Sequence, residues 1–179
     1  TEVSQRLTDT LIKAFGLSAC SQGTMNNFLF GNDRYSYYET IGGGAGAGPG
    51  FNGRSAIHQH MTNTKITDPE ELELRYPVLL KEFSIRKGSG GKGNFHGGHG
   101  INRVIQFLEA MTVTILAQHR VVAPYGLHGG QAGACGTQYL LRQGKKIKLT
   151  ANESFEVLSG DELSIHTPGG GGWGERNVD

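Results

Sequence analysis

Residues 101–118, INRVIQFLEAMTVTILAQ, contain two runs rich in β-branched and aromatic residues. Val113, Ile115 and Ala117 recur at every second position, and side chains two residues apart in a strand lie on the same face of a sheet. The stretch therefore predicts strands over 101–107 and 111–118, with these three side chains turned inward.

Similar runs lie on both sides of this stretch, each bounded by turn-forming residues. The turns are Gly31-Asn32-Asp33, Gln143-Gly144 and Ser159-Gly160-Asp161, and each is predicted to close a hairpin. The additional predicted strands are 24–30, 35–41, 78–86, 138–142, 145–149, 154–158 and 162–166.

Two helices are predicted. An amphipathic pattern near the start of the chain indicates a helix that ends at Gly16. Thr67-Asp68-Pro69-Glu70 fits a capping box with proline in the first turn, so a second helix should run from Asp68 to Arg75. Pro77 disfavours helical geometry at the residue before it. The apolar face of the first helix comprises Val3, Leu7, Leu11, Ala14 and Phe15.

These elements predict an α+β, β-rich fold with mixed or antiparallel sheets, arranged as a sandwich or a barrel-like structure. One helix is N-terminal, and the other is short and lies near 68–75. A chain of 179 residues is one domain's worth and buries a real core. We therefore expect residues 1–179 to form a single domain.

Composition excludes several classes of function. Lys+Arg 17 against Asp+Glu 16 gives a formal net charge of +1, and no basic run is long enough to follow a phosphate backbone, so nucleic acid is not expected as a partner. No apolar run approaches the roughly 20 residues that span a bilayer. The 2 cysteines do not form a disulfide framework, which favours a reduced, cytoplasmic setting.

Glycine is unusually abundant, at 29 of 179 residues, and is clustered. In 41–53 it forbids regular structure and permits close approach of the backbone to another group. Residues 88–93 match the letters of a dinucleotide-binding fingerprint, but no helix-like segment follows, and no Walker A sequence is present. These loops are predicted to be tight turns between strands or anion cradles of free backbone amides.

The stretch HQHMTNTKITDPEELELRYP, residues 58–77, combines two imidazoles with short polar side chains. In an extended segment His58 and His60 would point to the same side and bind a divalent cation or a carboxylate. A histidine pair without a third ligand is nevertheless more often structural or interfacial. Three side chains that donate and accept hydrogen bonds follow: Thr62, Asn63 and Thr64.

A second candidate is the loop AQHRVVAPYGLHGG, residues 117–130. Arg120 and Tyr125 would hold a carboxylate by charge-assisted hydrogen bonds. His128 in this loop, like His96 and His99 elsewhere, lies beside glycine pairs. Sites often lie on loops held by a rigid scaffold, so these loops are expected to line one cleft.

Five motifs in order give the chain a family resemblance. HQHMTNTKITDPEELELRYP, YYETIGGG, GSGGKGNFHGGHG, VAPYGLHGG and HTPGGGGWG resemble the C-terminal part of the hydantoinase B and ATP-dependent 5-oxoprolinase family. The resemblance runs from about Val3 to about Gly174. It implies that the chain is a C-terminal fragment of a longer polypeptide of this type.

The resemblance also implies an activity, the ATP-dependent opening of a cyclic amide. In 5-oxoprolinases the lactam oxygen is phosphorylated and the ring is hydrolysed to glutamate, whereas related hydantoinases open N-methylhydantoin-type rings. ATP and Mg²⁺ would be bound by a hydantoinase A-type partner, with no cofactor held tightly by this fragment. We expect an oligomer, and a fragment that is inactive alone.

The hypothesis for the site assigns catalysis to His58, His60 and Asn63. A histidine of the pair would act as general base, and Asn63 with nearby glycine amides would stabilise the oxyanion. Metal involvement is left open. Two alternatives remain, a non-catalytic assembly domain and a subunit of an acetone or acetophenone carboxylase. Substrate binding is assigned to Thr62, Thr64, Arg120, Tyr125 and His128.

The chain departs from the family pattern at two positions. Members commonly have Trp-Asp-Gly ahead of the histidine pair, where this chain has Phe51-Asn52-Gly53, and aspartate where it has His99. An aspartate acting there as a proton carrier or metal ligand has no equivalent here, because Asn52 cannot ionise and His99 has an imidazole in place of a carboxylate.

Overall fold

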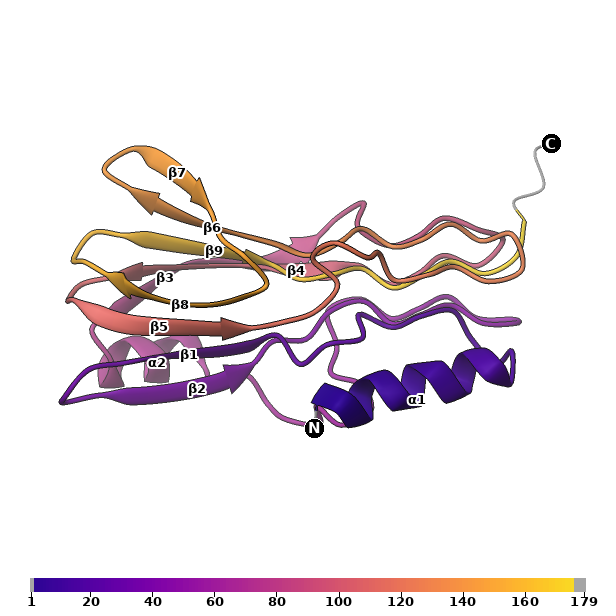
Figure 1. The fold of residues 1–179 in the computed structure, drawn as a ribbon, viewed down its shortest axis with the longest axis horizontal. Helices are drawn as coiled ribbons and strands as arrows, with labels where there is room; N and C mark the ends of the chain where they lie inside the picture. Colours follow the sequence, from indigo (N-terminus) through magenta and orange to yellow (C-terminus); the bar gives the residue numbers. More distant parts are fainter. Residues whose placement is uncertain (1, 176–179) are drawn as a thin grey trace.

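The structure is a computed structural model, which describes residues 2–175. The described part contains two helices and nine strands. The strands lie toward one end of the molecule's long axis (Figure 1). The elements are α1 (Glu2–Ala14), β1 (Asn27–Gly31), β2 (Ser36–Thr40), α2 (Pro69–Arg75), β3 (Val78–Arg86), β4 (Gly100–Phe107), β5 (Met111–Leu116), β6 (Thr137–Arg142), β7 (Lys145–Lys148), β8 (Asn152–Val157) and β9 (Glu162–His166).

The strands form two antiparallel sheets. One has four strands in the order β2-β1-β5-β8, and the other has five in the order β3-β4-β9-β6-β7. Apolar side chains of both sheets make a common core. The predicted β-rich α+β fold is therefore confirmed, and the two sheets form a sandwich that does not close into a barrel. Core residues include Phe28, Phe30, Val113 and Ile115 from the first sheet and Ile101, Ile105, Leu163 and Ile165 from the second.

Local patterns located most elements within a few residues. Val113, Ile115 and Ala117 are all at most 1% exposed, as the alternation predicts. The first predicted hairpin is present as β1 and β2, and β6 and β7 form another. Gln143 and Gly144 both have positive φ, at 48° and 75°, which suits a two-residue hairpin turn.

The hairpin predicted around Gly160 is wrong. β8 pairs with β5 in the first sheet, whereas β9 pairs with β4 and β6 in the second. Val157 and Leu163 on either side of the turn are both buried in the common core, because the chain crosses from one sheet to the other. Asp161 holds this crossing, since its carboxylate accepts hydrogen bonds from the Leu158 amide at 2.8 Å and from the Arg142 guanidinium at 2.7 Å.

The second helix begins and ends as predicted. The Asp68 carboxylate caps α2 by accepting a hydrogen bond from the Glu70 amide at 2.9 Å. Tyr76 is extended, with φ −128° and ψ 144°, so the helix ends before Pro77. Leu72 is fully buried and fixes α2 against the core.

A buried ion pair joins the two sheets. The Glu39 carboxylate of β2 accepts hydrogen bonds from Arg103 Nε at 2.7 Å and Nη2 at 3.1 Å on β4, and from the Tyr37 hydroxyl at 2.7 Å. Burial raises the pKa of Glu39, and the Arg103 charge opposes that rise. Each buried charge would be unpaired without the other, so β2 and β4 must keep the relative position that allows this bidentate contact.

The first helix packs with its polar face inward. Gln5 and Asp9 are 0% and 3% exposed, whereas Val3 and Leu7 are 80% and 57% exposed. The face beneath α1 presents backbone groups that need hydrogen-bond partners. Gln5 donates to the Gln59 carbonyl at 3.2 Å and accepts from the Met61 amide at 3.0 Å.

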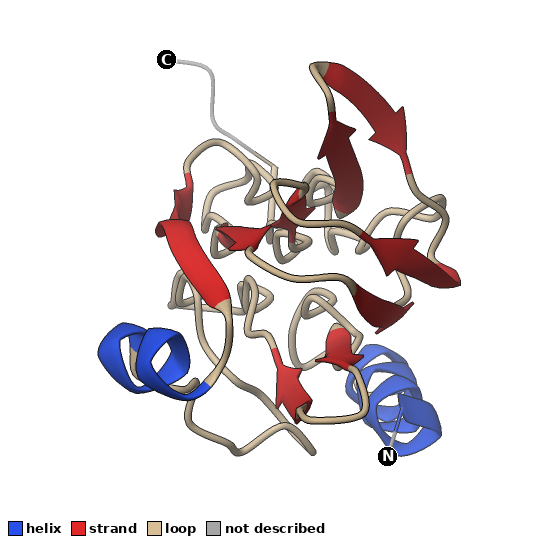
Figure 2. Ribbon diagram, turned by 90° about the vertical axis from the view of Figure 1, so that its left-hand side faces the viewer, coloured by secondary structure: helices blue, strands red, loops and turns tan. Residues whose placement is uncertain are grey.

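Beyond the sheets, four glycine-rich segments run side by side along α1 (Figure 1). Figure 2 views the molecule from the end at which the strands lie. We call these segments the glycine bundle, and they are 42–53, 88–98, 124–136 and 167–174.

The segment 167–174 is the centre of the bundle. A Cβ at Gly169 or Gly172 would meet segment 88–98, one at Gly170 would meet segment 42–53, and one at Gly171 would meet segment 124–136. Neighbours that recur every three residues are typical of the polyproline II conformation, which has no internal hydrogen bonds. Amides of the segment donate to other segments instead, for example from Gly170 to the Gly98 carbonyl at 2.9 Å.

Replacing Gly170 with alanine should prevent folding, or lower the free energy of unfolding by more than about 4 kcal/mol. Its Cβ would lie 1.8 Å from the Ala45 carbonyl oxygen, which is backbone and cannot move aside. Gly144→Ala is the control, because nothing lies within 4 Å and only the positive φ opposes it, at about 1 kcal/mol. Urea unfolding measures both, and equal losses would contradict the close packing.

Candidate functional site

Asp9 of α1 joins the two stretches that the sequence singled out. Its carboxylate accepts hydrogen bonds from the Ser21 amide at 3.2 Å and hydroxyl at 2.9 Å, and lies 3.3 Å from His60 Nε2. The Tyr125 hydroxyl donates to the Asp9 carbonyl at 2.8 Å. A helix residue therefore anchors both the 58–64 loop and the 117–130 loop.

The Asp9 carboxylate is ionised in this setting. Burial alone would raise its pKa, but the hydrogen bonds from His60 and Ser21 and the nearby His60 charge outweigh burial and lower it. An ionised carboxylate can only accept, so His60 Nε2 carries a proton and donates to it. His60 Nδ1 has no hydrogen-bond partner among the described residues, and in the neutral ring it keeps its lone pair.

Residues 58–64 form no strand. His60 has a φ of 53°, and the chain turns at this residue, so the expected extended pair is replaced by two differently placed rings. His58 Nδ1 is buried without a partner, and burial lowers the pKa of this imidazole. Within 2–175, no group of three or more metal-binding side chains is found.

The small polar side chains of this loop have different environments. Thr62 is fully buried, where its hydroxyl accepts from the Gln59 amide at 3.0 Å and donates to the Gln59 carbonyl at 2.9 Å. The Thr64 and Thr40 hydroxyls are 2.7 Å apart. Asn63 is exposed. Thr62 and Thr64 thus hold the loop in shape, and Asn63 faces outward.

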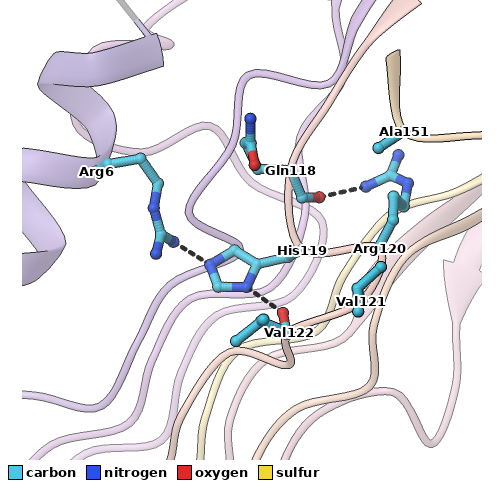
Figure 3. Close-up of a pocket in the computed structure, with 7 residues that line it drawn as sticks. All are labelled: Arg6, Gln118, His119, Arg120, Val121, Val122 and Ala151. Carbon is cyan, nitrogen blue, oxygen red and sulfur yellow. Dashed lines mark hydrogen bonds between the residues drawn. The ribbon is translucent and has the colours of Figure 1, made fainter. Parts of the chain in front are cut away.

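A cavity of about 250 Å³ lies beside His119 (Figure 3). His119 Nδ1 donates to the Val122 carbonyl at 2.6 Å, which leaves Nε2 to accept from the Arg6 guanidinium of α1. Burial and the Arg6 charge lower the pKa of His119. The lining residues are Arg6, Gln118, His119, Arg120, Val121, Val122 and Ala151, none of them acidic.

Arg120, which lines this cavity, has one side-chain donor without a partner among residues 2–175. Its Nε donates to Gln138 at 2.7 Å and its Nη1 to the Gln118 carbonyl at 2.9 Å, while Nη2 is buried with no partner in the described chain. Burial, reinforced by Arg86, lowers the pKa of Arg120 to about 10. A carboxylate is the group that such a lining accommodates.

The predicted substrate-binding residues do not share one cleft. Arg120 lines the cavity, Tyr125 contacts Asp9, and His128 packs against Trp173, with ring centroids 4.4 Å apart and ring planes tilted by 50°. Sequence reasoning missed Asp9 and Arg6, because a charge on an amphipathic helix is ordinarily solvated. Their position three residues apart, opposite the apolar face, was the available signal.

The model of the Hydantoinase B/oxoprolinase family matches residues 1–176. The chain belongs to this family. Over 97% of its length it is 51% identical to the 5-oxoprolinase of Dictyostelium discoideum and 52% identical to 5-oxoprolinase 1 of Arabidopsis thaliana. It spans 14% of the length of each of these family members.

Two solved structures share the fold. The ATP-dependent caprolactamase of Pseudomonas jessenii superposes with a TM-score of 0.80 at 23% sequence identity. The match covers 92% of the present chain and 32% of the caprolactamase chain. Acetone carboxylase gives a TM-score of 0.69 at 14% identity, over 94% and 28%. Along residues 2–175, no helix has the length and apolar character needed to cross a bilayer.

The free energy of unfolding should fall as the pH drops below about 6.5. Burial lowers the pKa of His58, His119 and His166, so the unfolded chain takes up protons that the folded chain refuses. This stability is present above the unfolded pKa and is lost as the pH falls through the folded values. Urea unfolding at about pH 7.5 and about pH 5.5 tests it.

His119→Gln is the matched variant, because glutamine can donate to Val122 and accept from Arg6 without titrating. It should make the stability less dependent on pH. An unchanged dependence would contradict the role of His119.

Proposed function

We propose that this chain is the C-terminal part of an ATP-dependent enzyme that hydrolyses a cyclic amide, with 5-oxoproline as its substrate. About 50% identity to two 5-oxoprolinases across nearly the whole chain carries the proposal. ATP and Mg²⁺ would be bound by a hydantoinase A-type part of the enzyme. The present chain would contribute a base and a carboxylate site to the assembled enzyme.

His60 is the proposed general base. Asp9 holds its Nε2 proton and thereby orients the ring, which leaves Nδ1 to take a proton from water. After phosphorylation of the lactam oxygen by the A-type part, the water would add to the former carbonyl carbon, and C–N cleavage with proton transfer to the nitrogen would give an acyl phosphate. A second water would attack that carbonyl and release glutamate and phosphate. The exposed Asn63 amide, with glycine amides, would stabilise the oxyanion that forms.

Arg120 is proposed to bind the substrate's carboxylate. Its unpartnered Nη2 and the absence of acidic side chains among the residues that line the cavity support this role. 5-Oxoproline carries a carboxylate, whereas a simple lactam does not. The proposal therefore favours an acid-bearing ring.

In the complete enzyme, His60→Ala should lower kcat for 5-oxoproline hydrolysis by about two orders of magnitude. Asp9→Asn should lower it less, because the base remains but its orientation is lost. ATP-dependent glutamate release measures both, and Ser4→Ala on the exposed side of α1 is the control. Wild-type turnover in His60→Ala would remove this residue from the mechanism.

A non-catalytic assembly domain is the second candidate. It is favoured by the exposed apolar face of α1, and by the fact that none of the described cavities is lined by residues 58–64. An exposed apolar stripe of this kind marks an interaction surface. Its proposed occupant is another part of the same enzyme. The most exposed residues of the stripe are Val3, Leu7, Leu11 and Phe15, at 80%, 57%, 48% and 72%.

The double variant Leu7→Glu, Leu11→Glu should weaken association of this chain with the rest of the enzyme by about a hundredfold, because it removes two leucines that association would bury. Co-purification of the separately expressed parts measures this. Thr10→Glu, exposed on the same helix, is the control. Under the assembly reading, turnover per assembled complex stays normal in His60→Ala. Unweakened association in the double variant would show that the stripe is not the contact.

A further inference from the structure

A second, open cavity of about 460 Å³ lies where the loop 52–55 meets segment 88–98 of the glycine bundle and the residue after it. It belongs to neither the His60 region nor the cavity beside His119. None of its lining residues is acidic. They are Asn52, Gly53, Ser55, Gly88, Gly90, Lys92, His96, Gly97 and His99.

The backbone fixes the hydrogen-bonding state of His99. The Gly90 amide donates to His99 Nδ1 at 3.0 Å, and a ring nitrogen that accepts a hydrogen bond carries no proton. The proton of the neutral ring must then be on Nε2, which is a donor. The Ser55 hydroxyl accepts from the His99 amide at 2.9 Å and holds this residue in place.

Asn52 is likewise left with donors. Its Oδ1 accepts from the His96 amide at 2.7 Å, so its NH₂ group is the part still available. Lys92 adds an ammonium group, for which no hydrogen bond or ion pair is found among the described residues. The groups of His99, Asn52 and Lys92 that remain available are therefore donors, and no carboxylate among the lining residues neutralises them.

Glycine makes this arrangement possible. A Cβ at Gly90 would lie 2.0 Å from the Gly97 carbonyl oxygen, so only glycine lets the two backbones approach closely enough to place the Gly90 amide on His99. The His99 donor is thus set by the packing of the bundle, before any ligand arrives. Preorganised donors of this kind lower the cost of binding an anion.

We propose that this cavity binds a small oxyanion, a carboxylate or a phosphate, through His99 Nε2, the Asn52 amide and the Lys92 ammonium group. The site goes beyond the proposed function, which places the substrate's carboxylate at Arg120. Asn52 and His99 are also the two positions at which the chain departs from the aspartates of the family pattern. Aspartates there would make the same cavity acidic, so anion binding is a property of this chain's own residues.

Titration of the full chain with inorganic phosphate, and separately with acetate, tests the site by calorimetry and by ¹⁵N NMR of the histidine rings. At least one anion should bind and shift the His99 resonances, and the pair of titrations distinguishes phosphate from carboxylate. Lys92→Ala and His99→Asp should each weaken binding about tenfold or more, because each removes a charge-assisted hydrogen bond. Lys148→Ala, exposed on β7, should leave binding unchanged.

Aspartate at position 99 can still accept from the Gly90 amide, so this variant changes charge while keeping the local hydrogen bond. His99→Asn keeps the same acceptor without the charge and should bind more weakly than wild type but better than His99→Asp. Binding of neither anion, wild-type binding by His99→Asp, or a free His99 ring protonated on Nδ1 would each overturn the proposal.

Discussion

The close approach of glycine backbones is the constraint on which this structure depends. In segment 167–174, consecutive residues contact different neighbouring segments, and a Cβ at Gly170 would lie 1.8 Å from a carbonyl oxygen. Polyproline II segments have no internal hydrogen bonds, so each must find its partners on other segments. Backbone hydrogen bonds between these segments hold together the loops that carry candidate site residues.

The inverted packing of α1 has a related cause. A helix that covers an apolar sheet turns its apolar face inward, but Gln5 and Asp9 meet the irregular segments around Ser21 and 59–61, whose backbone amides and carbonyls need hydrogen-bond partners. Gln5 and Asp9 therefore face inward, and the leucines face solvent. The inversion brings Asp9 to His60 and Arg6 to His119. Helix, loops and bundle thus form one polar interior.

The positions of the charged residues determine the character of the cavities, whereas the net charge does not. The formal net charge is +1, yet three buried carboxylates are used in internal pairs, Asp9 with His60, Glu39 with Arg103 and Asp161 with Arg142. Each pair offsets the cost of burying a charge. With these acids engaged inside, no acidic side chain is among the residues that line the cavities beside His119 and His99.

The sequence by itself determined the features that depend on neighbours along the chain. The alternation at Val113, Ile115 and Ala117 placed a strand, the Asp68 cap started α2, and the motifs around the glycines indicated the family. These are local energies or recurring letters, which a linear reading can register. The same reading identified 58–64 and 117–130 as stretches of interest, although it expected the histidine pair of 58–64 to lie in an extended segment.

Only the tertiary structure decided which side chains meet. The partnership of Asp9 with His60 spans 51 residues, and the turn at Gly160 joins two sheets where a hairpin was expected, because Val157 and Leu163 are buried from opposite sides. The His99 tautomer depends on an amide nine residues away that glycine packing puts in reach. Such contacts are chosen by the packing of the whole chain, and no local periodicity encodes that choice.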